Sequence, residues 1–268
     1  MRRRPRIMGI LNVTPDSFSE GGRAYTTAQA VAAGMRLAED GADIVDVGGE
    51  STRPGADEVP LAEELRRTVP VVRALAGAGI AVSIDTMKAG VMRAALDAGA
   101  TMLNDVSALQ ADPDSMAVAA GADAAVVLMH MPGNPRTMQA LAHYDEPVED
   151  VLAALQKRVE AAVAGGVERR RIVVDPGIGF GKKLAHNLAI LRALERFHAL
   201  GLPVMLGASR KAVIAGVVGD TPMAERLPGS LALALRGAEA GVSWVRVHDV
   251  AATRQALLLW EAAWPDRN

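Results

Sequence analysis

Seven polar side chains stand at the carboxyl ends of short apolar runs, where a parallel sheet would gather them at one edge. They are Asn12, Asp46, Asp85, Asn104, Asp175, Arg246 and His248. A single buried Asp or Asn in such a place is most often a helix cap or a loop anchor. Seven at the same end of successive runs instead indicate a binding or catalytic site.

The acids and amides of this set suit a flat ligand rich in N–H donors. A carboxylate such as Asp85 or Asp175 can accept two parallel hydrogen bonds from a guanidine-like edge. Arg246 and His248 stand two residues apart and so face one side of a strand, which favours a phosphate or diphosphate. Asn12 offers a hard oxygen to Mg²⁺, an ion that takes few protein ligands and completes its shell from substrate phosphates.

Nucleophilic catalysis by the protein is not indicated. The sequence has no Gly-x-Ser-x-Gly elbow, no His-Glu-x-x-His pair and no cysteine. A glycine-rich segment at 175–183, Asp-Pro-Gly-Ile-Gly-Phe-Gly-Lys-Lys, is neither a dinucleotide fingerprint nor a P-loop. Catalysis by positioning and by stabilising a leaving group therefore fits the residues better.

Short apolar runs and helical patterns alternate along the chain. The runs suit strands buried on both faces of a parallel sheet, and they cover 7–12, 44–48, 80–85, 102–104, 125–129, 172–175, 203–207 and 245–248. Helical patterns cover 27–40, 61–78, 88–98, 113–120, 148–164, 187–200, 225–240 and 251–263, several of them stopped by Gly41, Gly99, Gly121, Gly201 or Gly241. This α/β series predicts a single (β/α)8 TIM barrel domain over residues 1–268, with a doubly wound open sheet as the structural alternative.

Composition narrows the class of protein. The 268 residues carry a net charge of -2, half of them are hydrophobic, and none is a cysteine. Near-neutral charge argues against nucleic-acid binding through phosphate contacts, and the lack of cysteine excludes thiolate metal sites. Without an apolar run of about 18 residues or a cleavable leader, the sequence predicts a cytoplasmic protein with neither nucleic-acid nor membrane partners.

Two connections on the predicted rim are long for this kind of fold. They cover residues 14–26 after the first strand and 48–59 after the second. Long βα loops are often lids or binding loops, although either one alone could be an ordinary surface loop.

Motifs spread along the chain resemble those of the dihydropteroate synthases, a family of folate-pathway enzymes. The two most specific are 9–19, Gly-Ile-Leu-Asn-Val-Thr-Pro-Asp-Ser-Phe-Ser, and 46–55, Asp-Val-Gly-Gly-Glu-Ser-Thr-Arg-Pro-Gly. Shorter matches follow in family order at 83–86, 104–105, 128–131, 175–177, 209–211 and 246–249. The resemblance therefore covers nearly the whole chain.

The resemblance implies a reaction and a fold. The family condenses 6-hydroxymethyl-7,8-dihydropterin diphosphate with 4-aminobenzoate to give 7,8-dihydropteroate and diphosphate, on a homodimeric (β/α)8 barrel. It is thought to expel diphosphate first, leaving a pterin methylene cation that the aniline nitrogen attacks. Sulfonamides, which mimic aminobenzoate, are expected to inhibit.

The resemblance also implies the site residues. The pterin would be held by Asp85, Asn104, Asp175 and Lys211, with Met129 lining its pocket. The diphosphate and Mg²⁺ would be bound by Asn12, Arg246 and His248, with help from Thr52. The aminobenzoate pocket would be formed by Arg53, Pro54, Phe180, Ser209 and Lys211. The residues expected to contribute to catalysis are Asn12, Asp85, Lys211, Arg246 and His248.

Two other interpretations share the barrel. A methyltetrahydrofolate–corrinoid methyltransferase would keep the pterin floor but would need no diphosphate site, so the predicted anion-binding residues speak against it. A non-catalytic pterin-binding paralogue would keep the shape without the activity. The presence of every expected contact residue argues against that interpretation.

Overall fold

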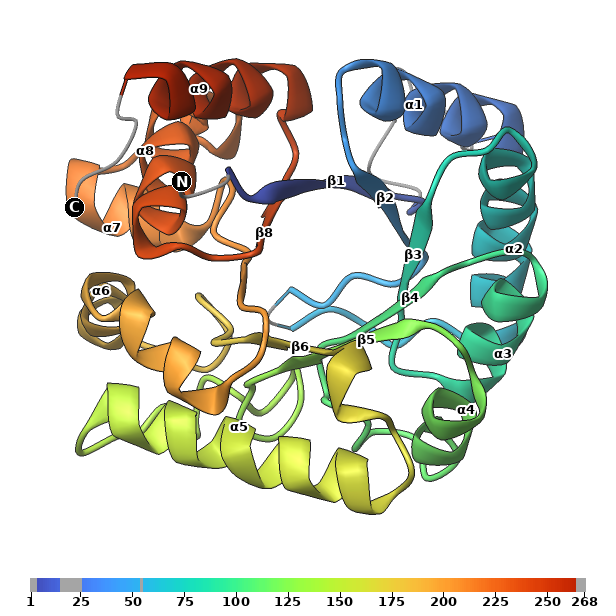
Figure 1. Cartoon of the computed structure of the whole chain (residues 1–268), viewed down its shortest axis with the longest axis horizontal. Coiled ribbons are helices and arrows are strands. Elements are labelled where there is room, and N and C mark those ends of the chain that lie inside the picture. The colour runs from blue at the N-terminus through green and yellow to red at the C-terminus, as the bar shows by residue number, and fades with distance from the viewer. Residues whose placement is uncertain (1–3, 15–25, 54, 264–268) are drawn as a thin grey trace.

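The computed structural model describes residues 4–14, 26–53 and 55–263. Within these ranges eight parallel strands form one sheet that curls into a barrel (Figure 1). In chain order they are β1 (Arg6–Asn12), β2 (Ile44–Gly48), β3 (Val82–Asp85), β4 (Met102–Asp105), β5 (Ala125–Met129), β6 (Ile172–Asp175), β7 (Met205–Leu206) and β8 (Trp244–Val247).

The strands follow one another around the barrel in the order β6-β5-β4-β3-β2-β1-β8-β7. The two ends of this series meet through a single bridge between Val174 and Val204, next to a hydrogen bond of 2.9 Å from Val174 N to Pro203 O. The barrel is therefore nearly closed, which confirms the predicted (β/α)8 fold and excludes the open sheet. That all 268 residues form one domain stays a prediction.

Helices surround the strands on the outside (Figure 1). They are α1 (Thr27–Glu39), α2 (Leu61–Gly77), α3 (Ala89–Asp97), α4 (Ser115–Gly121), α5 (Pro147–Ala164), α6 (Leu184–Arg192), α7 (Ala212–Val218), α8 (Leu227–Ala240) and α9 (Val250–Ala263). None of them is long and apolar enough to cross a bilayer, a finding that covers the described residues alone.

Three helical predictions need correction. The pattern at 187–200 is two elements, α6 and a 3-10 helix at Leu194–Leu200, and α7 was not predicted at all. Gly121 is the last residue of α4 and does not follow it, because the chain turns extended at Ala122. The other four predicted stop glycines do adopt the left-handed conformation that ends a helix.

The inside of the barrel is apolar at one end and polar at the other. Its floor is a buried cluster of Met8, Ile44, Met102, Val127, Val173, Met205 and Trp244. Side chains two residues further along a strand point the same way, which gives Asp46, Asn104, Asp175 and Arg246 to the same inner face. A polar layer therefore lies above an apolar floor, at the carboxyl ends of the strands.

Candidate active site

Side chains from three neighbouring strands converge around Gly207, which follows β7. A methyl group on Gly207 would lie 3.5 Å from Asp175 Oδ2, 3.8 Å from Arg246 Cβ and 3.9 Å from Lys211 Nζ. Asp175 and Arg246 therefore lie at the same end of the barrel. The absence of a side chain at position 207 leaves room for a ligand between them.

A second convergence involves the register of β1 to β4. Asn12 is paired with Gly48, Gly48 with Asp85, and Asp85 with Asn104 on the next strand. A methyl group on Gly48 would lie 3.6 Å from Asp85 Oδ2 and 3.8 Å from Asn12 Oδ1. The expected Mg²⁺ ligand thus borders the expected pterin floor.

Asp46 organises the polar layer, although it was not among the predicted ligand-binding residues. Its Oδ2 accepts hydrogen bonds from Arg246 Nε at 2.7 Å and from Asn104 Nδ2 at 2.9 Å. Arg246 Nη2 donates to Asp85 Oδ2, also at 2.7 Å. Asp85 Oδ1 is buried with no hydrogen-bond partner among the described residues, so it is the atom that can accept from a ligand.

Burial and neighbouring charges act in opposite directions on the pKa values of Asp85 and Arg246. Burial raises the pKa of Asp85 to about 7 against the opposing charge of Arg246, and the carboxylates of Asp46 and Glu64 raise it further. For Arg246, burial acts to lower the pKa, but Asp46 and Asp85 outweigh it and hold the pKa above its usual value. Arg246 therefore keeps its charge, whereas the protonation of Asp85 changes near neutral pH.

Lys211, Asp175 and Phe180 form a second group beside this network. Lys211 Nζ donates to Ile178 O at 2.5 Å and lies 4.5 Å from the centre of the Phe180 ring. Asp175 Oδ1 accepts the Gly177 N–H at 2.7 Å. This leaves Oδ2 facing the opening of the barrel at the carboxyl ends of its strands, which we call the mouth. Burial lowers the pKa of Lys211 to about 8 against the nearby charge of Asp175, and burial raises the pKa of Asp175.

Ser209 and His248 form a third pair on the same side. The His248 N–H donates to Ser209 Oγ at 3.2 Å, and Ser209 Oγ lies 3.0 Å from His248 Nδ1. Which of the two side chains donates in the Ser209–His248 contact depends on the tautomer of the imidazole ring. Burial and the charges of Arg246 and Arg210 lower the pKa of His248 to about 4. His248 is therefore neutral near pH 7 and adds no positive charge to the site.

The remaining predicted residues belong to the loop after β2. Thr52 is half-buried and Arg53 is exposed, with its Nη2 3.7 Å from Met223 Sδ on the far side of the mouth. Pro54 lies outside the described residues, as does most of the predicted loop at 14–26. Met129, next to Asp175 in the register of β5 and β6, is buried as expected.

Met129 belongs to an apolar wall that sequence reasoning did not identify. It packs in a buried cluster with Val106, Met131 and Met138, and Phe180 lies against the same cluster. The cluster supplies an apolar face, which suits the flat ring of a ligand. The wall combines residues from β5 and from the loops after β4, β5 and β6, so it becomes visible only when these strands lie side by side.

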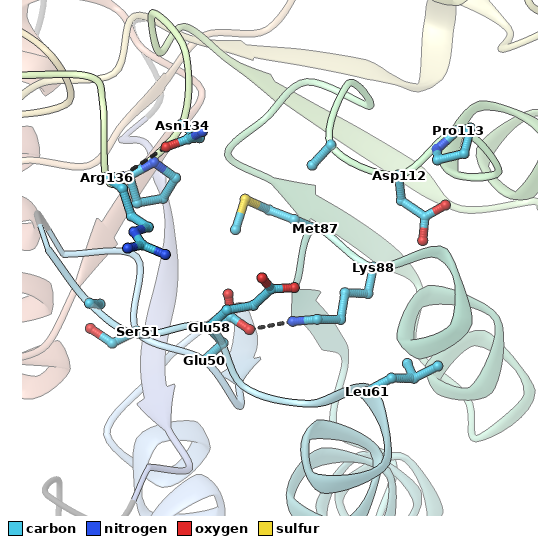
Figure 2. Close-up of a pocket in the computed structure, with 13 residues that line it drawn as sticks. Glu50, Ser51, Glu58, Leu61, Met87, Lys88, Asp112, Pro113, Asn134 and Arg136 are labelled. Atoms are coloured by element: carbon cyan, nitrogen blue, oxygen red, sulfur yellow. Dashed lines mark hydrogen bonds and ion pairs between the residues drawn. The ribbon is translucent and has the colours of Figure 1, made fainter.

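A cavity of about 600 Å³ opens beside the mouth, over the loops that follow β2 to β5 (Figure 2). None of the predicted ligand-binding residues lines it. On its wall Lys88 Nζ makes ion pairs with Glu50 and, at 2.7 Å, with the buried Glu64. Because Glu50 directly precedes Ser51, this buried ion cluster anchors the start of the loop that carries Thr52 and Arg53.

The donor set of the mouth sets limits on a metal. In the part of the chain that the structure describes, no three His, Asp or Glu side chains are grouped as a metal site. Asn12 supplies one amide oxygen beside Asp85. This set fits Mg²⁺ that arrives with a phosphorylated ligand and keeps several waters. It does not fit an ion held by protein ligands alone.

Comparisons with protein families, with curated relatives and with solved structures all match this chain to pterin-binding enzymes. Residues 8–248 match the family model described as pterin binding enzyme. Dihydropteroate synthase of Haemophilus influenzae is 46% identical over 259 residues, which are 96% of this chain and 94% of the relative. The structure of Xanthomonas albilineans dihydropteroate synthase with 4-aminobenzoic acid is 49% identical, with a TM-score of 0.92 and coverage of 98% and 94%. The Yersinia pestis enzyme in a sulfonamide drug complex is 43% identical, with a TM-score of 0.93 and coverage of 98% and 95%.

Proposed function

The chain belongs to the pterin binding enzyme family, and from that premise we propose that it performs the dihydropteroate synthase reaction at this mouth. It would join 6-hydroxymethyl-7,8-dihydropterin diphosphate to 4-aminobenzoate and release diphosphate. One observation carries the proposal: acids able to grip a pterin and groups able to contact a diphosphate converge around Gly207. A pterin-binding methyltransferase would need only the first set.

The pterin would lie on the inner acids. Asp175 Oδ2, left open because Oδ1 is held by Gly177 N–H, would accept from the amino-pyrimidine edge. Asp85 Oδ1, buried without a partner among the described residues, would accept a second ring N–H. Asn104 is oriented by its bond to Asp46, and Met129 would cover one face of the ring.

Departure of diphosphate would be assisted on the side of β8. Arg246 donates from Nε to Asp46 and from Nη2 to Asp85, so Nη1 is the guanidinium nitrogen that remains for a phosphate oxygen. His248, which is neutral, would offer a ring hydrogen bond to the leaving group without adding a charge. Asn12 would hold Mg²⁺, which when bound supplies positive charge that lowers the barrier to diphosphate loss.

Attack by 4-aminobenzoate would follow from the side of Lys211. The ring would lie near Phe180, and Lys211, Ser209 and Arg53 are the polar groups available to its carboxylate. A neutral aniline nitrogen needs no strong base to attack a cationic methylene, which agrees with the lack of a placed base. The residues would act by positioning the two rings and by electrostatic stabilisation.

The test is release of diphosphate from dihydropterin diphosphate, measured with and without 4-aminobenzoate and with and without Mg²⁺. We expect diphosphate and dihydropteroate in equal amounts, with turnover falling when Mg²⁺ is removed by a chelator. Methyl transfer from a reduced folate to a corrinoid, without diphosphate release, would favour the methyltransferase. Pterin binding with no turnover would favour the non-catalytic paralogue.

Assembly and location extend the proposal. We infer a homodimer in the cytoplasm, and exposed apolar side chains support an interface at α7 and α9: Val217 and Val218 are 60% and 65% exposed, and Leu259 is 66% exposed. Large exposed apolar groups on the outer helices of a barrel are typical of a covered face. Light scattering should give twice the chain mass, and Leu259→Glu together with Val218→Glu should give a monomer.

A further inference from the structure

A buried lysine that the mechanism does not use lies behind the aminobenzoate side of the mouth. Lys182 is 4% exposed, and its Nζ contacts four acceptors. It donates to Gly177 O at 2.9 Å, Phe180 O at 3.0 Å and His130 O at 3.2 Å, and it lies 2.9 Å from His130 Nδ1. Burying an ammonium is costly unless it is fully hydrogen-bonded, so this placement has a reason beyond packing.

Two of the acceptors of Lys182, the carbonyls of Gly177 and Phe180, belong to the segment 176–183, which has little regular structure of its own. Gly177, with φ of 69°, crosses His130 so closely that a methyl group on it would lie 2.0 Å from His130 O. Side chains hold the remainder: Asn187 Oδ1 accepts from Gly179 N at 2.7 Å, and the Tyr144 hydroxyl donates to Gly181 O at 2.9 Å. Without these bonds a glycine-rich segment would sample many conformations.

The same segment presents its other side to the mouth. Ile178 O accepts from Lys211 Nζ, and the Phe180 ring lies beneath that ammonium. Lys182 therefore holds the carbonyl of Phe180 from behind while the ring of Phe180 meets Lys211 in front. A shift of the segment would move the ring and the acceptor of Lys211 together.

We propose that Lys182 is a positioning residue for 4-aminobenzoate: its ammonium gathers the carbonyls of Gly177, Phe180 and His130 as a bound cation would, and so fixes Phe180 and Lys211. The proposal rests on the proposed function, which assigns the ring and carboxylate of aminobenzoate to that pair. Burial lowers the pKa of Lys182 to about 7, while the nearby charge of Asp175 favours its ammonium form. Of the pterin residues, Asp85 and Asn104 belong to β3 and β4. Asp175 contacts the segment through Gly177 N–H, but it is held in place on β6, which is paired with β5 along its whole length.

The experiment compares Lys182→Met with Lys183→Met in the full chain, by steady-state kinetics with each substrate varied in turn. Lys183 is the exposed neighbour and gives the matched control. We expect the KM for 4-aminobenzoate to rise about tenfold in Lys182→Met, with a parallel rise in the inhibition constant of a sulfonamide. The KM for dihydropterin diphosphate should stay within about threefold, and the control should match the unaltered chain.

A second variant serves if Lys182→Met does not fold. Tyr144→Phe keeps the ring and removes the hydrogen bond to Gly181 O, and it should raise the aminobenzoate KM about two- to threefold without changing the pterin KM. Unchanged KM values with a lower Tm would overturn the proposal, because Lys182 would then support only folding. An equal rise in both KM values would overturn it too. An unaltered chain that makes no dihydropteroate would instead refute the proposed function.

Discussion

The pKa of Asp85 is subject to two opposed effects inside the barrel: burial raises it and the charge of Arg246 lowers it. The pKa of this carboxyl is raised from 3.8 to about 7, chiefly by burial, even though Arg246 donates to its Oδ2. Between these values the folded chain keeps a proton that the unfolded chain has lost. The stability that this carboxyl contributes is therefore fully present below pH 3.8 and is lost as the pH rises through about 7. Asp85→Asn cannot titrate and should abolish this loss.

The magnitude follows from the width of that window. Each pH unit between the unfolded and folded pKa values costs about 1.4 kcal/mol for one proton. From pH 4.5 to pH 8 the free energy of unfolding should therefore fall by about 3 kcal/mol more in the unaltered chain than in Asp85→Asn. The comparison removes the contributions of shifted groups that do not interact with Asp85, such as Lys182 and Arg158, a neighbour of Asp105, since both chains carry them.

Urea unfolding followed by circular dichroism at several pH values gives this difference directly. Asp97→Asn, a change at an exposed carboxyl on α3, is the control and should give a flat difference profile. A flat profile for Asp85→Asn would mean that its pKa is not raised. A difference of the opposite sign would mean that the pairing with Arg246 outweighs burial. Turnover by Asp85→Asn should be severely reduced at every pH, because the variant lacks the acid that would accept from the pterin.

Four further outcomes are expected. Asp175→Asn should weaken pterin binding in calorimetry by about 1.5–3 kcal/mol; affinity close to that of the unaltered chain would contradict the Asp175 assignment. Arg246→Ala should lower kcat more than it raises the aminobenzoate KM, and the reverse would move the diphosphate contacts elsewhere. Sulfonamides should compete with aminobenzoate at inhibition constants near its KM; constants orders of magnitude higher would refute this. Gly177→Ala, whose methyl would meet His130 O at 2.0 Å, should lower the Tm sharply, whereas an unchanged Tm would mean that the turn relaxes.

The barrel could be predicted because its strands are buried on both faces. The apolar runs of β2, β5 and β6 have the bounds expected from the sequence, since few other structures need unbroken apolar runs so short. The helix α7 escaped prediction because four of its seven residues are β-branched and Gly216 lies among them, a composition with low helix propensity. The local sequence pattern therefore predicts strands that are apolar on both faces. It does not predict a short helix such as α7, which is stabilised by its contacts with the rest of the fold.

The position of the site could be predicted, but not the pairing within it. Alternation along β2 and β8 places Asp46 and Arg246 on the inner face of the barrel, and Asp85 is the last residue of β3. That Arg246 turns toward Asp46, 200 residues away in sequence, is set by how the barrel closes. For the same reason the sequence predicts no role for Lys182, which follows a glycine-rich segment. Its partners at His130 and Phe180 come together only when β5 and β6 lie side by side.

The balance of charge in the mouth bears on why a diphosphate would leave there. The acids Asp46, Asp85 and Asp175 are matched in number by the cations Arg246, Lys211 and Lys182, and His248 is neutral. What matters is their position: an ionised carboxylate such as Asp175 lies next to the place proposed for the pterin, where its negative charge opposes an anionic ligand and favours a cationic one. Loss of diphosphate converts the first kind of ligand into the second. The carboxylates beneath the pterin therefore stabilise the product of that step more than its reactant, which is the differential binding that lowers a barrier.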